Sequence, residues 1–178
     1  KKETSTKLAL TVIVLALSPV AISAEEPWKF IVTCDSRGYT NGIEPIILRE
    51  IATEIVEQGA DFVLFPGDLV YGYSAAGPSG FEAQLRTWVE IMKPVYDAQI
   101  GVYVCRGNHE ISDVWGMSPY PDIDPCDYYA TRWLNVFGSD FHPEQKLPDN
   151  GPPEEEYMTY SLIHKNAFVV SLDHYAGV

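Results

Sequence analysis

Basic residues are scarce in this sequence. Its 178 residues include 12 Lys and Arg against 25 Asp and Glu, which gives a net charge of −13. Proteins that bind nucleic acids normally present a basic surface to the phosphates. We therefore expect no nucleic-acid polymer as a partner, although a single Arg can still hold a small phosphorylated substrate. Most of the negative charge is interpreted as a contribution to solubility.

Cysteine is scarce too, with three residues in the chain. An odd number leaves at least one thiol unpaired within the chain. Cys34 and Cys105 end apolar stretches, where a free Cys acts as a small buried hydrophobe. We favour this interpretation over a disulfide or a catalytic thiol, because no base stands at a recognisable spacing. A Gly-x-Ser-x-Gly nucleophile elbow is also missing, which argues against a serine hydrolase.

The apolar stretch near the start of the chain is short. Leu8–Leu17 spans ten residues, whereas a membrane-spanning helix needs about 20. It follows a basic segment, Lys1–Lys7, and precedes the small residues Ser23 and Ala24. This pattern is typical of a secretory signal peptide. We expect residues 1–24 to be a signal peptide, the mature protein to be secreted or periplasmic, and no stable membrane insertion.

Apolar residues are abundant in the rest of the chain. Hydrophobic residues make up 46% of the sequence and charged residues 21%, which is typical of one globular domain. Three apolar runs, each followed by polar residues, are predicted to be strands: Lys29–Cys34 before Asp35, Asp61–Pro66 before Asp68, and Gly101–Cys105 before Asn108 and His109.

Two helices are predicted between these strands. Gly42–Gly59 and Phe81–Gln99 carry apolar residues at helical spacing. The first closes with a Gly, and Pro94 is expected to shorten or bend the second. The order βαβαβ predicts an α/β fold with right-handed crossovers and a parallel sheet. All three strand tips then emerge at the same edge of the sheet.

The rest of the sequence is less regular. Asp127–Phe137 is predicted to be a helix, and Tyr157–Ile163 with Ala167–Asp173 is predicted to form a hairpin. Residues 111–125 and 141–156 are rich in Pro and Asp or Glu, and are predicted to be connections at the surface.

The strand tips carry groups that can bind metals. Asp35, Asp68, Asn108 and His109 supply oxygen and nitrogen donors, which suit divalent and trivalent metal ions. An Asp or Asn at a strand end is often only a helix cap. Convergence of three tips at one edge favours the metal-binding interpretation. The pattern predicts a metal-dependent hydrolase.

Three blocks of residues, taken together, resemble a known family. Asp35, Gly67–Tyr71 and Gly107–Glu110 are similar to the first three signature blocks of the calcineurin-like metallophosphoesterases. Tyr71, at the end of the second block, is similar to the purple acid phosphatase branch. The combination is specific because each block follows an apolar strand. The resemblance spans about residues 29–175 and implies a metallophosphoesterase-type sandwich.

The resemblance also implies roles for individual residues. Two metal ions would bind, iron together with zinc, manganese or a second iron. Asp35 would bind the first, Asp68 would bridge both, and Asn108 would bind the second. Such ions, about 3.5–4 Å apart, activate a water and stabilise the charge of phosphoryl transfer. His109 would face the phosphate or the leaving group, and Glu110 would support the ligands without binding metal.

The sequence departs from the family in two respects. Most members have a His where Arg37 stands, and Arg37 is expected either to hold a phosphate oxygen or to pair with a nearby carboxylate. Tyr71 is expected to supply the missing metal ligand, with packing under the next loop as the alternative. The family's later His blocks have no counterpart in this chain. His142, His164 and His174 are not expected to replace them.

These departures imply that residues 25–178 are the N-terminal part of a metallophosphoesterase domain, truncated before its C-terminal half and inactive alone. Two functions stay open. The first is a phosphoesterase that hydrolyses phosphate mono- or diesters through a binuclear metal centre and an activated water. The second is a non-catalytic binding or surface protein on a degenerate phosphoesterase fold. Asp173, which lies one strand further on in the predicted hairpin, is expected to matter little to the site. Oligomeric state is not specified by the sequence.

Overall fold

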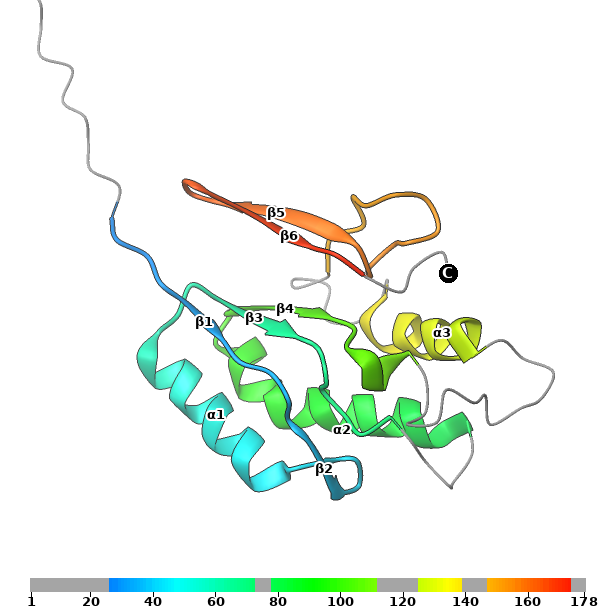
Figure 1. Ribbon diagram of the computed structural model, residues 1–178. Helices are drawn as coiled ribbons and strands as arrows, with labels where there is room; N and C mark the ends of the chain where they lie inside the picture. The colour runs from blue at the N-terminus through cyan, green and yellow to red at the C-terminus, as the bar shows by residue number, and fades with distance from the viewer. Residues whose placement is uncertain (1–25, 73–77, 112–124, 139–146, 174–178) are drawn as a thin grey trace, which may run out of the picture.

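The computed structural model describes residues 26–72, 78–111, 125–138 and 147–173. The expected signal peptide, residues 1–24, lies outside these ranges. A small parallel sheet lies between two helices on one face and a hairpin on the other (Figure 1). None of the helices in the described ranges has the length and apolar character needed to span a bilayer.

The sheet is the predicted one. Its strands are β1 (Phe30–Val32), β3 (Phe62–Pro66) and β4 (Gly101–Cys105), all parallel and in the order β1-β3-β4. At its centre, Val63 pairs with Ile31 on one side and Val102 on the other. The central strand therefore needs an apolar run, which is what Phe62–Pro66 provides.

Two helices make the crossovers between these strands. They are α1 (Pro45–Gln58) and α2 (Pro78–Asp97). Gly59 ends α1 in a left-handed conformation with φ of 58°, as its position after the apolar repeat predicted. Pro94 lies inside α2, which continues to Asp97. The helices pack on the sheet through buried apolar residues that include Leu48, Ile55, Val63, Leu85 and Trp88.

The last part of the chain adds a helix and a hairpin. The helix α3 (Pro125–Phe137) packs against α2. The hairpin consists of β5 (Tyr160–His164) and β6 (Ala167–Ser171), which pair antiparallel as a separate two-stranded sheet. It lies over the face of the β3–β4 sheet that the helices leave open (Figure 1).

One expectation about the cysteines is wrong. Cys34 is exposed, because β1 ends at Val32 and the chain has already left the sheet at position 34. Cys105 is partly buried, and its thiol donates to the carbonyl of Phe65. A hydrogen bond with Asp35 raises the pKa of Cys34, and burial raises the pKa of Cys105. Neither thiol is activated as a nucleophile.

Asp61 fastens the turn of the hairpin to the start of the sheet. One of its oxygens accepts from the backbone N–H of Lys29 at 3.1 Å. The other lies 3.2 Å from Nε2 of His164 and 3.6 Å from Nζ of Lys165. The hydrogen bond from Lys29 is the main cause that holds the pKa of Asp61 below its usual value, and the two side chains add to it. His164 is thus engaged at the amino end of β3, opposite the strand tips.

We expect Asp61→Asn to destabilise the fold more at neutral pH than at acidic pH. The folded-state pKa of Asp61 lies below its usual value of 3.8. Its contribution to stability is therefore present above that pH and is lost as the pH falls through the folded-state pKa. Urea unfolding over a series of pH values should show a stability gap between wild type and variant that closes on acidification. Asp97→Asn, at an exposed pair with Lys93, is the control and should change little. A gap independent of pH would contradict the assignment.

Candidate active site

The loops at the carboxyl ends of the strands converge, as the parallel topology requires. The loop after β1 meets the loop after β3 where the backbone N–H of Asp35 donates to the carbonyl of Gly67 at 3.4 Å. The loop after β3 meets the loop after β4 where the N–H of His109 donates to Oδ1 of Asp68 at 3.4 Å. Three predicted site residues from three strand tips therefore lie at one edge.

Arg37 lies between the two aspartates. It is the first residue of β2 (Arg37–Thr40), a short strand that the sequence analysis did not predict. Its Nη2 is 3.7 Å from Oδ1 of Asp35, and its Nε is 3.3 Å from Oδ2 of Asp68. Its Nη1 contacts Nε2 of His109. The guanidinium thus joins both carboxylates and the imidazole, and makes the carboxylate pairing that was one of the two expectations for Arg37.

The contacts of His109 define its proton position. Nδ1 lies 2.6 Å from the carbonyl oxygen of Tyr71, which can only accept a hydrogen bond. The proton is therefore on Nδ1. Nε2 is left as the acceptor for Arg37, because a guanidinium can only donate. The ring is buried and its orientation is fixed from both sides.

Asn108 and Tyr71 are placed less centrally. Asn108 begins η1 (Asn108–Glu110), where its side chain is exposed. Within the described residues, no hydrogen bond joins its amide to Asp35 or Asp68. The ring of Tyr71 packs beside two other rings. Its centroid is 5.5 Å from that of the His109 ring and 5.6 Å from that of the Tyr39 ring.

Both aspartates have a left-handed backbone. The φ angle is 59° at Asp35 and 53° at Asp68. This conformation is uncommon for a residue with a side chain, although Asp tolerates it better than most. Such positions cost about 1–3 kcal/mol and gather at functional sites. Two of them at adjoining strand tips support a functional role for this edge.

Glycines allow the loops after β3 and β4 to come together. Gly67 has φ of 89°, and a Cβ there would lie 2.6 Å from the Cα of Gly107. A Cβ on Gly107 would lie 2.3 Å from Oδ1 of Asp68. Side chains at either position would therefore push Asp68 away from the second loop. The glycines of both signature blocks are needed for this approach.

Glu110 binds the same two loops with its carboxylate. It is fully buried, and accepts from the backbone N–H groups of Asp68 at 2.9 Å, Val70 at 3.1 Å and Gly107 at 2.8 Å. Burial raises the pKa of Glu110 to about 7, while these N–H groups act to lower it. This is the supporting role expected for Glu110 from the sequence, in which nothing identifies its three partners.

Ser36 is a residue that the sequence analysis missed. Its buried hydroxyl donates to the carbonyl of Leu69 at 2.8 Å and accepts from Nε1 of Trp88 at 2.9 Å. It therefore joins the loops after β1 and β3 to helix α2. No pattern in the sequence distinguishes this Ser from an exposed one.

The donors present suit a hard cation in their chemistry. Asp35 and Asp68 both direct a carboxylate oxygen at the cationic Arg37, so the place already attracts positive charge. Carboxylate and amide oxygens are the ligands such ions prefer. Within the described residues, no group of three or more His, Cys, Asp or Glu side chains is arranged as a metal site. His142 and His174 lie outside the described ranges.

Known proteins that are similar to this chain come from a family model and from the solved structures. A family model described as calcineurin-like phosphoesterase matches residues 40–172. Among solved structures, a purple acid phosphatase from yellow lupin (Lupinus luteus) seeds is similar, with 18% identity and a TM-score of 0.45. The similarity covers 76% of this chain and 22% of that structure, so the chain spans about a fifth of its length. No curated protein matches the sequence.

We expect Glu110→Gln to destabilise the protein by about 1–3 kcal/mol, because the amide has one acceptor oxygen for three N–H groups and turns a donor toward one of them. Urea unfolding measures the loss. Glu90→Gln makes the same chemical change on an exposed face of α2 and should cost little. Equal effects of the two substitutions would show that the Glu110 hydrogen bonds contribute nothing.

Proposed function

Since the chain belongs to the calcineurin-like phosphoesterase family, we propose that it is a metal-dependent phosphoesterase acting on phosphate mono- or diesters. The observation that carries this proposal is the convergence of Asp35, Arg37, Asp68 and His109 at one edge of the sheet. The left-handed backbone of both aspartates adds to it. The substrate would be a small phosphorylated molecule, in keeping with the acidic composition.

Asp35, Asp68 and Asn108 are the residues that would hold two metal ions, with Asp68 shared between them. Iron with zinc, manganese or a second iron is the proposed pair. When bound, these ions supply an activated water and countercharge for the phosphoryl group. Asp68 suits the shared position because its carboxylate lies against both Arg37 and the N–H of His109.

Arg37 and His109 would act on the substrate. The planar fork of Arg37 can bind two phosphate oxygens in place of its present carboxylate partners. His109 is held through Nδ1 by the carbonyl of Tyr71, so Nε2 is the atom that faces the site. Nε2 carries no proton while it accepts from Arg37; when Arg37 turns to the phosphate, Nε2 would take up a proton from solvent and donate it to the leaving oxygen. A fixed ring lowers the entropic cost of that transfer.

Tyr71 is proposed as a further metal ligand. Arg37 stands where a His ligand is expected in the family, and a cation cannot coordinate a cation. Tyr71 is three residues beyond Asp68 and its ring already contacts the ring of His109. Its contact with Tyr39 is the argument for a packing role instead.

A non-catalytic binding protein is the second candidate. The observation that favours it is the position of Arg37, whose single positive charge already pairs with both aspartates. The repulsion between the two carboxylates is reduced in this way, and the guanidinium could bind an anion without any metal ion. Export through a signal peptide at residues 1–24 is proposed for either function.

Asp68→Asn should reduce bound metal and the hydrolysis of an aryl phosphate by at least about tenfold in the full-length protein, because it removes the shared carboxylate. Bound metal is measured by elemental analysis, and turnover is measured beside it. Asp97→Asn changes an exposed carboxylate far from the site and serves as the control. Metal and turnover that persist in Asp68→Asn would refute the assignment. A wild-type protein that binds phosphate without metal or turnover would favour the second candidate.

Tyr71→Phe should abolish a visible charge-transfer band in the protein loaded with ferric iron, because such bands arise from phenolate bound to that ion. The absorption spectrum is recorded beside the iron content of each protein. Tyr39→Phe is the matched control, since it alters a neighbouring phenol whose ring contacts Tyr71. A colour that survives Tyr71→Phe, or a colourless wild type with a full complement of ferric iron, excludes ligation by Tyr71.

A further inference from the structure

A buried ion pair joins the end of the hairpin to the tip of β4. Nε of Arg106 lies 2.6 Å from Oδ2 of Asp173, and the two side chains are 2% and 0% exposed. Arg106 immediately precedes Gly107, at the start of the turn that carries Asn108 and His109. Asp173 follows β6 by two residues. Asp173, which was expected to matter little to the site, therefore contacts the residue that begins the turn of Asn108 and His109.

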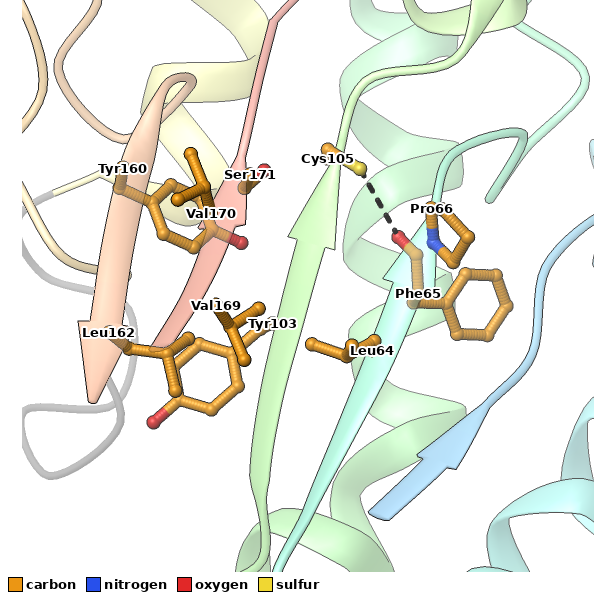
Figure 2. Close-up of a pocket in the computed structure, with 10 residues that line it drawn as sticks. All are labelled: Leu64, Phe65, Pro66, Tyr103, Cys105, Tyr160, Leu162, Val169, Val170 and Ser171. Carbon is orange, nitrogen blue, oxygen red and sulfur yellow. Dashed lines mark hydrogen bonds between the residues drawn. The ribbon is translucent and has the colours of Figure 1, made fainter. Parts of the chain in front are cut away.

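Other polar contacts also hold this end of the hairpin. The backbone N–H of Asp173 donates to Oγ1 of Thr159 at 3.0 Å, and the hydroxyl of Tyr160 donates to the carbonyl of Val104 at 2.6 Å. Figure 2 shows the region between the hairpin and strands β3 and β4, where side chains such as Val169 and Tyr103 line a mostly apolar cavity of about 100 Å³. Apolar contact alone does not specify how the hairpin sits, so the polar contacts must.

The ion pair is a costly way to gain stability. Removing two charges from water costs several kcal/mol per ion, and apolar residues of similar size are often as stabilising or more so. Nη1 of Arg106 adds to the cost, because it is buried with no hydrogen-bond partner in the described part of the chain. We therefore expect the pair to contribute less to the stability of the fold than to the position of the hairpin relative to β4.

Arg106 is well placed to transmit that geometry. The residue after it, Gly107, donates to Oε2 of Glu110 and packs against Asp68 without room for a Cβ. A shift of the backbone at Arg106 would therefore move the turn against Asp68. We propose that Arg106 and Asp173 are positioning residues, which use the hairpin to hold the turn of Asn108 and His109 in register with Asp68. The effect on metal binding rests on the function proposed above.

The test uses the double variant Arg106→Met with Asp173→Leu in the full-length protein. These residues fill a similar volume without charge, so we expect the free energy of unfolding to be retained or raised. Amide hydrogen exchange at His109 and Glu110 should become at least about tenfold faster in this variant, and affinity for Mn²⁺ should fall by about tenfold or more. If the pair had a purely structural role, exchange at these amides and Mn²⁺ affinity would change only as far as the free energy of unfolding changes.

Tyr160→Phe is the matched control, because it removes another hydrogen bond between the hairpin and β4 without touching Arg106. It should leave exchange at His109 and Glu110, and Mn²⁺ affinity, close to wild type. Unchanged exchange at these two amides in the folded double variant would overturn the proposal. So would an equal acceleration in Tyr160→Phe, because the effect would then belong to any contact of the hairpin.

If the double variant does not fold, Asp173→Asn provides the second test, since it keeps the size of the side chain and removes its charge. Faster exchange at His109 and Glu110, with hairpin amides such as that of Val170 unchanged, supports the proposal, and wild-type exchange overturns it. Hydrogen exchange needs neither metal nor turnover. A wild-type protein that neither binds metal nor hydrolyses substrate would therefore refute the proposed function. Hydrogen exchange would still decide whether the ion pair positions the turn.

Discussion

The candidate site depends on one carboxylate that binds backbone. Glu110 accepts from three N–H groups on two loops, and it does so without exposure to water. Because its partners include Asp68 and Gly107, it determines how closely the loops after β3 and β4 approach. Gly67 and Gly107 make that approach possible by leaving no side chain between the loops. The backbone N–H of Asp68 donates to Glu110, and the backbone N–H of His109 donates to the carboxylate of Asp68, so both site residues depend on Glu110 for their placement.

Negative charge at this edge is partly offset by Arg37. Two carboxylates at adjoining strand tips would repel each other if nothing cationic lay between them, and the guanidinium contacts both. The enzymatic and the binding hypotheses differ in which cation lies between the carboxylates during function. It is the metal ions in the first hypothesis and Arg37 in the second. The same physical feature thus supports either function, and Arg37 is the residue on which they diverge.

The hairpin is held mainly at its two ends. At one end Asp61 joins its turn to the start of β1, through His164, Lys165 and the N–H of Lys29. At the other end Arg106 and Asp173 join it to the strand tip that leads into the site. Between these ends, apolar side chains line a cavity. Directional contacts at both ends determine a placement that apolar packing leaves free.

Patterns local in sequence determined the parallel sheet, its two crossover helices and the hairpin. Apolar runs at strand period, apolar repeats at helical period and a closing Gly59 act within a few residues, so they can be found without knowing the fold. Parallel topology then placed Asp35, Asp68 and His109 at one edge. The short strand at Arg37, the exposure of Cys34, the three partners of Glu110 and the pairing of Arg106 with Asp173 were decided by tertiary structure alone. These features join residues far apart in the sequence, or depend on where a strand ends in space, and no local pattern encodes such contacts.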